Sequence, residues 1–130
     1  MHPAAIAFEA PNRAAVIMAA TGSVTTFAEL DARSNQLAHV IREAGVQGGG
    51  SLAIFAENHP RFLEVTWAAQ RSGIYYTAIN SHLTAPEAAY IIDDCDASIV
   101  VSTQALADVA IAACSRDATP RVTLRLTSSA

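Results

Sequence analysis

Four short apolar runs, separated by segments long enough for a helix, constrain the fold of this chain most strongly. The runs are "SLAIFA", "YYTAI", "SIVV" and "RVTLRL", at residues 51–56, 75–79, 98–101 and 121–126. The first two are expected to be buried strands, because an apolar run without polar alternation is typical of a parallel strand covered on both faces. Strands that alternate with helices predict an α/β fold with an open, mostly parallel sheet, flanking helices and right-handed crossovers. A chain of 130 residues has room for one modest core, so we expect residues 1–130 to form a single unit.

The segments between these runs carry the start and stop signals of helices. Thr26 and Glu29 have the spacing of an N-terminal capping box, and Gly45 stands where a left-handed cap would end that helix. Thr84 and Glu87 repeat the capping box farther along the chain. Helices are therefore predicted to begin at about residues 26, 60, 84 and 103. Their expected inward positions are Leu30, Leu37, Ile41 and Ala44; Phe62, Leu63, Thr66, Trp67 and Gln70; Ala88, Ile91 and Ile92; and Leu106, Val109, Ala110 and Ala113.

The stretch "TGSVTTFAEL", residues 21–30, has the hydroxyl and glycine content of a phosphate-binding loop. Such a loop follows a buried strand, turns through several glycines and usually presents a lysine. This stretch has one glycine, and the chain has no lysine. The apolar run "AAVIMAA" at residues 14–20 and the β-prone residues 24–26 flank the turn. We therefore interpret the stretch as a short β-hairpin followed by a helix cap.

Two other motifs also favour structural readings over ligand binding. The "GGG" at residues 48–50 precedes a strand instead of following one, which favours a flexible connection over a dinucleotide-binding loop. The "DDCD" at residues 93–96 falls where a helix ends, and we interpret it as a solvated acidic turn and not as a metal site.

The charges and cysteines exclude several classes of function. The net charge is −4, and the eight basic residues are arginines scattered singly, so we expect no surface for nucleic acid or anionic lipid. The absence of lysine excludes Schiff-base chemistry. The start of the chain has no leader pattern, and no apolar run reaches the roughly 18 residues of a membrane span. Cys95 and Cys114 lack CxxC spacing, so we interpret them as reduced thiols of a cytoplasmic protein.

Polar residues follow the predicted strands at the edge where open α/β sheets bind ligands. The predicted edge comprises Asn58, His59, Asn80, Ser81, His82 and Ser102. By contrast, His2 lies in the irregular start of the chain and His39 on the polar side of a helix. Asn58 has a second interpretation, since a helix-capping role is favoured over ligand contact. No Ser/His/Asp or Cys/His arrangement can be assembled from spacing, so no catalytic, cofactor or metal site is assigned.

Several sequence blocks together resemble the opening segment of one enzyme family. The blocks "TFAELD", "NQLA", "AIFAEN" and "AINSHLT", at residues 26–31, 35–38, 53–58 and 78–84, are similar in order and spacing to adenylate-forming (AMP-binding) enzymes, and among them to acyl-CoA synthetases. The blocks "FLE", "WAA" and "EAAYIIDD", at residues 62–64, 67–69 and 87–94, support the same resemblance. The match is weaker over residues 117–130.

The resemblance implies that the chain is a partial N-terminal subdomain of an acyl-CoA synthetase (fatty-acid–CoA ligase). Such enzymes use ATP and magnesium to convert a fatty or other apolar acid to an acyl-adenylate, and then transfer the acyl group to coenzyme A. Their phosphate loop and catalytic lysine lie downstream of the matched segment. We therefore expect the chain alone to be inactive and to bind none of these cofactors. Its expected partner is the remainder of the adenylation domain or a complementing chain, with self-association through an exposed sheet edge as a further possibility.

Two other hypotheses stay open at this point. The chain could be a non-catalytic binding module that docks a ligase or an acyl carrier. It could also be an unrelated small α/β enzyme that uses His59 or His82 as its acid or base.

Overall fold

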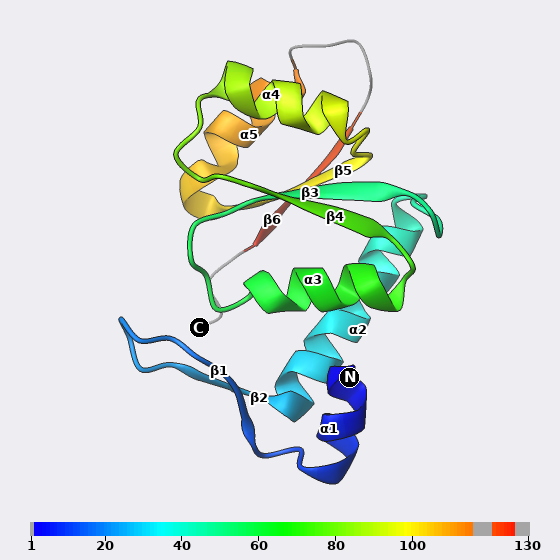
Figure 1. Ribbon diagram of the computed structural model, residues 1–130, viewed down its shortest axis with the longest axis vertical. Coiled ribbons are helices and arrows are strands. Elements are labelled where there is room, and N and C mark those ends of the chain that lie inside the picture. Colours follow the sequence, from blue (N-terminus) through cyan, green and yellow to red (C-terminus); the bar gives the residue numbers. More distant parts are fainter. Residues whose placement is uncertain (1, 116–120, 127–130) are drawn as a thin grey trace.

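A four-stranded parallel sheet forms the centre of the protein (Figure 1). The computed structural model describes residues 2–115 and 121–126. Its strand order is β4-β3-β5-β6, so β3 (Ser51–Phe55) and β5 (Ile99–Thr103) lie in the middle. β4 (Tyr75–Ile79) and β6 (Val122–Leu126) form the two edges. The predicted open, parallel α/β sheet is therefore confirmed.

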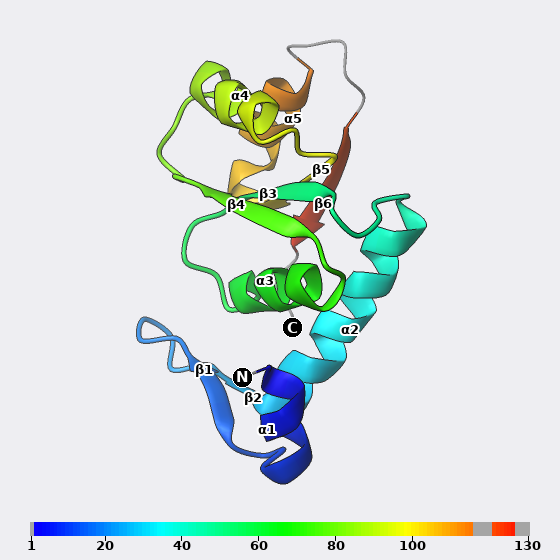
Figure 2. The ribbon, with the colours of Figure 1, turned by 45° about the vertical axis from the view of Figure 1, so that its right-hand side comes forward.

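Helices cover both faces of this sheet (Figures 1 and 2). α4 (Ala85–Asp94) and α5 (Ala107–Cys114) lie on one face, and α2 (Phe27–Glu43) and α3 (Phe62–Arg71) lie on the other. A short 3-10 turn, η1 (Gln104–Leu106), leads from β5 into α5. The predicted hairpin consists of β1 (Ala14–Ile17) and β2 (Val24–Thr26), and it lies away from the sheet beside α1 (Pro3–Glu9) and the start of α2. No helix of residues 2–115 and 121–126 is both long and apolar enough to cross a membrane.

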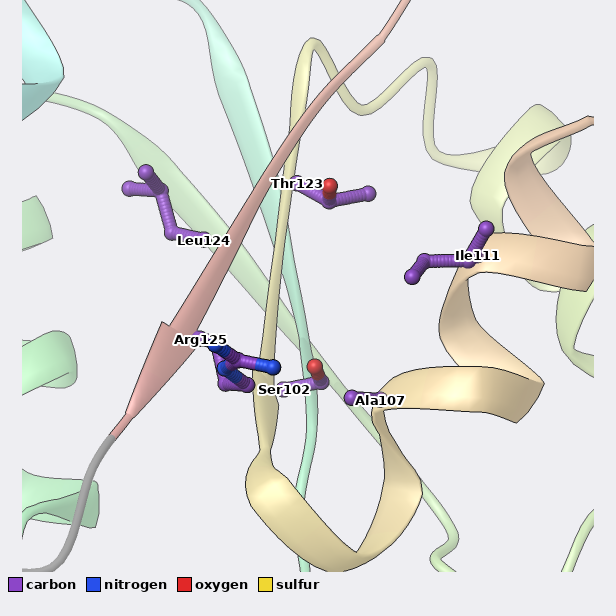
Figure 3. Close-up of a pocket in the computed structure, with 6 residues that line it drawn as sticks. All are labelled: Ser102, Ala107, Ile111, Thr123, Leu124 and Arg125. Atoms are coloured by element: carbon purple, nitrogen blue, oxygen red, sulfur yellow. The ribbon is translucent and has the colours of Figure 1, made fainter.

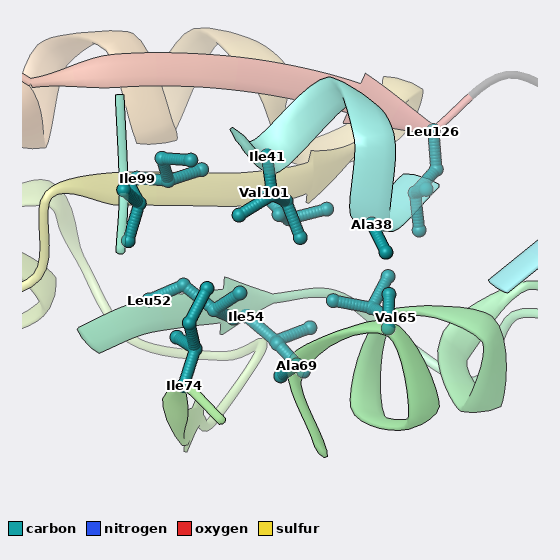
Figure 4. Packing of buried hydrophobic residues seen from close by; sticks show 12 residues of the cluster. Ala38, Ile41, Leu52, Ile54, Val65, Ala69, Ile74, Ile99, Val101 and Leu126 are labelled. Carbon is teal, nitrogen blue, oxygen red and sulfur yellow. The ribbon is translucent and has the colours of Figure 1, made fainter. Parts of the chain in front are cut away.

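The alternation of side chains along the central strands builds two cores, one on each face. Leu52 and Ile54 of β3 pack with α2 and α3, as Figure 4 shows, whereas Ala53 and Phe55 pack with α4 and α5. Both central strands are buried because neighbouring strands and helices cover every side of them. The prediction that "SLAIFA" is a strand covered on both faces is confirmed.

The second predicted buried strand is instead a sheet edge. Tyr75 and Tyr76 of β4 are 72% and 48% exposed, because β4 pairs only with β3 among the described strands. An aromatic, β-branched run resembles a buried strand in sequence, and composition alone does not distinguish a central strand from an edge. The prediction of burial was wrong for this strand.

The inward face of α3 also differs from the predicted one. Leu63 is 38% exposed and Gln70 is exposed, while Val65, Ala68 and Ala69 are fully buried. Small alanine side chains let the helix approach the sheet closely, so the buried face is centred on them and not on the larger residues.

A short N-terminal helix, α1, lies where the sequence was interpreted as irregular. Its cap is His2, whose Nδ1 accepts a hydrogen bond from the Ala4 amide at 3.2 Å. The imidazole also packs edge-on against the indole of Trp67 in α3, with 5.0 Å between ring centroids. His2 thereby anchors α1 to the helical layer.

This anchor predicts that stability depends on pH. Burial, together with the Arg71 charge, lowers the pKa of His2 from its ordinary 6.5. Below about pH 6.5, His2 therefore binds a proton more readily in the unfolded chain than in the folded chain. The free energy of unfolding should consequently fall as the pH falls. Urea unfolding at several pH values measures this effect. The variant His2→Asn retains a capping side chain and should lose this part of the pH dependence. An unchanged pH profile in that variant would mean that His2 does not cause the effect.

Both predicted N-caps are present, and the one at Thr84 is a complete capping box. The Thr26 Oγ1 accepts a hydrogen bond from the Glu29 amide at 3.2 Å at the start of α2. Gly45 has a φ of +90°, the left-handed conformation predicted for the end of that helix. At α4 the Thr84 amide and hydroxyl donate to Glu87 Oε1 at 3.0 and 2.8 Å. The hydrogen bond from the Thr84 amide and, to a smaller extent, the one from its hydroxyl lower the pKa of Glu87.

Replacing Thr84 by alanine should lower the free energy of unfolding by about 1 kcal/mol, the typical value of an N-cap. Thr84→Ser keeps the hydroxyl and should stay close to the parent. Thermal unfolding of the two variants side by side is the measurement. Equal destabilisation by both would show that the hydroxyl of Thr84 does not stabilise α4.

Candidate functional site

The carboxyl edge of the sheet carries the predicted site residues in three separate groups. Asn58 and His59 follow β3, and residues 80–82 follow β4. Ser102 is the next-to-last residue of β5. The structure thus places all six at the expected edge. It does not gather them around one cavity.

The first group borders a cavity of about 420 Å³ under the hairpin. Its walls come from residues 18–25 of the hairpin, from Glu29 and Arg33 of α2, and from residues 58–60 after β3. We call it the hairpin cavity. The loop after β3 and the tip of the hairpin lie on the same side of α3 in both views of the chain (Figures 1 and 2). The stretch that resembled a phosphate loop therefore forms a hairpin and a helix cap, as predicted, and also lines this cavity.

The loop between β3 and α3 corrects the interpretation of Asn58. α3 begins at Phe62 with Arg61 at the cap position, so Asn58 does not cap it. In the turn that precedes the helix, His59 Nδ1 accepts a hydrogen bond from the Arg61 amide at 3.1 Å. A neutral His59 consequently carries its proton on Nε2.

The second group forms a tight turn on the surface. The side chain of Asn80 accepts a hydrogen bond from the His82 amide at 2.9 Å, and both residues are exposed while Ser81 is half-buried. An Asn side chain that bonds the backbone two residues ahead is a common turn device. These residues therefore have a structural role that the sequence interpretation did not include.

The third group is the single residue Ser102, near the carboxyl end of the central strand β5. Ser102 is 3% exposed and borders a cavity of about 230 Å³ between β6 and α5. Figure 3 shows Ser102 and Thr123 on the side of the sheet that faces Ile111 of α5, with Leu124 pointing the other way. No titratable side chain other than Arg125 lines this cavity among the described residues.

Two carboxylates near this edge escaped the sequence interpretation. Glu57, just after β3, accepts a hydrogen bond from the buried Thr103 hydroxyl. Glu64 of α3 is fully buried, and its Oε2 lies 2.9 Å from Arg61 Nε while its Oε1 lies 3.5 Å from Arg33 Nη1. The signal that could have identified Glu64 is its spacing of four from Ala68, which places it on the buried face of α3.

The acidic turn behaves as a surface feature. Asp93 pairs with Arg121 at 2.8 Å, and the side chain of Asp93 is 54% exposed. Within residues 2–115 and 121–126, no three histidine, cysteine, aspartate or glutamate side chains gather as a metal site. Cys95 and Cys114 form no disulfide among the described residues, and both are partly buried.

Known proteins resemble the chain in both sequence and fold. The family model described as "AMP-binding enzyme" matches residues 4–129. Feruloyl-CoA synthase from Amycolatopsis sp is 35% identical over 82 residues, which is 63% of this chain and 17% of that protein. Long-chain fatty acid transport protein 1 from Homo sapiens is 32% identical over 91 residues, which is 70% of this chain and 14% of that protein.

A solved structure extends the likeness to three dimensions. The N-terminal domain of FACL13 from Mycobacterium tuberculosis aligns with a TM-score of 0.82 at 26% identity, covering 97% of this chain and 32% of that domain. The chain thus spans only a minor share of each of these relatives. Because the family match runs over almost the whole chain, this chain belongs to the AMP-binding enzyme family.

Proposed function

We propose that this chain is the opening part of the adenylation domain of an acyl-CoA ligase that activates a fatty or other apolar carboxylic acid. The observation that carries the proposal is the family match over residues 4–129, combined with a fold like that of the FACL13 N-terminal domain. The relatives named for feruloyl-CoA and long-chain fatty acids support an acid of this class. Family membership also removes the hypothesis of an unrelated small α/β enzyme.

In the complete ligase, the parallel sheet would serve as a scaffold and its carboxyl edge as one wall of the active-site crevice. Ligands of open α/β sheets bind beyond the carboxyl ends of the strands, which is where residues 58–59, 80–82 and 102 lie. None of these side chains is assigned a chemical role.

The complete ligase would use ATP, magnesium and coenzyme A, but the residues of this chain do not fit the nucleotide or the metal. The chain has no lysine for the phosphates. Its glycine-rich segment, residues 48–50, lies at the amino ends of the strands, away from the ligand-binding edge. The described residues also lack a cluster of metal-binding side chains. We therefore propose that the chain alone does not form an acyl-adenylate.

The partner that this function requires is the remainder of the adenylation domain, or a separate chain that replaces it. The exposed Tyr75 and Tyr76 mark the β4 edge as one open surface for it. Without that partner, the same edge favours self-association. A second candidate, a non-catalytic module that docks a ligase or an acyl carrier, is favoured by the same exposed aromatic edge. The protein would act in the cytoplasm in either case.

ATP–pyrophosphate exchange tests the proposal. The purified chain should give no exchange with palmitate, and the native species captured from its own cells with an antibody to this chain should give exchange with a fatty or aromatic acid. Exchange by the chain alone would contradict the first expectation. An inactive native species, tested with a panel of such acids, would favour the docking module.

A further inference from the structure

The hairpin cavity has features of a small-molecule site that the proposed function does not use. Its volume of about 420 Å³ lies in the usual range for such sites, roughly 300–1,000 Å³. Its walls combine residues between positions 18 and 33 with the distant residues 58–60, so its shape depends on the folded chain. Among the described residues, Glu29 and Arg33 are the only aspartate, glutamate, lysine or arginine side chains that line it.

These two charged side chains remain available to a ligand. Arg33 Nη2 lies 3.4 Å from Glu29 Oε2, and Arg33 Nη1 lies 3.5 Å from Glu64 Oε1. Charge-assisted hydrogen bonds are normally about 2.7–2.9 Å, so both contacts are long. Glu64 makes its shorter ion pair with Arg61, whose Nε lies 2.9 Å from Glu64 Oε2. Thr26 Oγ1 also donates a hydrogen bond to Glu29 Oε1, at 3.2 Å. The side chains of Arg33 and Glu29 are nevertheless 32% and 44% exposed, so both groups retain surface that a ligand can reach.

Opposite charges side by side select for a ligand that also carries both charges. A simple anion would be attracted by Arg33 and repelled by Glu29. A simple cation would be attracted by Glu29 and repelled by Arg33. A zwitterion with its ammonium and carboxylate on one carbon can satisfy both groups at once. The rest of the wall combines apolar contacts from Met18, Val24 and Pro60 with hydroxyl groups of the hairpin.

We propose that the hairpin cavity binds a zwitterionic α-amino acid with a small apolar side chain, its carboxylate on Arg33 and its ammonium group on Glu29. The Nε2 proton of a neutral His59, which lines the same cavity, supplies a further donor for the carboxylate. The proposal goes beyond the acyl-CoA ligase assignment and does not rest on it, because binding here needs neither ATP nor turnover.

Titration of the ¹⁵N-labelled chain by L-valine, followed by NMR, tests the site. Valine should shift the amide signals of Val24, Thr25 and His59 in a saturable manner. Isovalerate lacks the ammonium group and isobutylamine lacks the carboxylate, so each should bind at least about tenfold more weakly. Equal affinity for valine and either analogue would overturn the proposal, and so would the absence of saturable shifts with valine.

Two charge variants test the roles proposed for Glu29 and Arg33. Glu29→Gln should remove the preference for valine over isovalerate, and Arg33→Gln should remove the preference over isobutylamine. Arg42→Gln and Glu43→Gln are matched controls, since both residues are exposed at the far end of the same helix, and they should leave valine binding unchanged. Because Arg33 also contacts buried Glu64, a folding defect in Arg33→Gln would leave Glu29→Gln as the decisive variant. Retained discrimination between valine and isovalerate in Glu29→Gln would overturn the proposal.

Discussion

Replacing Phe55 by alanine should lower the free energy of unfolding by about 3–5 kcal/mol, the usual cost of removing a buried phenylalanine. Phe55 is fully buried at the end of the central strand β3 and packs with Ile79, Ala88 and Ile92 on the α4 and α5 face. The lost contacts would leave a cavity that alanine-rich helices, already close to the sheet, cannot fill. Because the free energy of unfolding of a natural domain is roughly 5–15 kcal/mol, the variant should lose a large share of its stability.

Urea unfolding followed by circular dichroism measures the loss. Phe8→Ala is the matched control, since it makes the same substitution at a side chain that is 91% exposed. It should change stability by less than about 0.5 kcal/mol. Similar losses for the two variants would contradict the placement of Phe55 in the core.

Replacing Glu64 by alanine should lower the free energy of unfolding by about 2–4 kcal/mol. Removing one partner of a buried ion pair typically costs about 3–5 kcal/mol, because the other charge stays behind without compensation. Here Arg61 and Arg33 are 25% and 32% exposed, so water can solvate them partly and the expected loss is smaller. The loop after β3 should also loosen, since Arg61 sits at the start of α3.

Urea unfolding of Glu64→Ala measures the loss of stability, and hydrogen exchange measures the loosening of the loop after β3. Glu64→Gln keeps a hydrogen-bond acceptor for Arg61 and should lose less stability than Glu64→Ala. Glu43→Ala removes an exposed glutamate from the end of α2 and should be nearly neutral. A loss below about 0.5 kcal/mol in Glu64→Ala would show that the buried pair does not stabilise the fold.

The sequence predicted the sheet, its parallel direction and most helix starts, because these depend on local patterns. Thr26, Gly45 and Thr84 act within one turn of their own positions, so their spacing was sufficient. The strand "SLAIFA" was recognisable because a strand buried on both faces must be apolar throughout.

The features that escaped prediction depend on contacts between distant parts of the chain. The edge position of β4 depends on which strands pair, and no pattern within residues 75–79 contains that information. Arg33 and Glu64 meet across 31 positions of sequence, so their pairing follows from the packing of α2 on α3. The α1 cap at His2 was missed because its stabilising contact, Trp67, lies in another helix.

The positions of the candidate site residues in the fold could be predicted only in part. The rule that ligands bind at the carboxyl edge of a parallel sheet placed Asn58, His59 and Ser102 correctly at that edge. It could not indicate that the hairpin covers one part of the edge and creates a separate cavity there. Glu29 was therefore interpreted only as part of a helix cap, and Arg33 was not singled out.

The assignment of this chain to a larger acyl-CoA ligase is tested most directly by the mass of the native species in the cells that make it. Immunoblotting and peptide mapping with an antibody to this chain should find a polypeptide or a tight complex several times heavier than 13.6 kDa. A native species of about 13.6 kDa that runs as a free monomer would contradict the assignment.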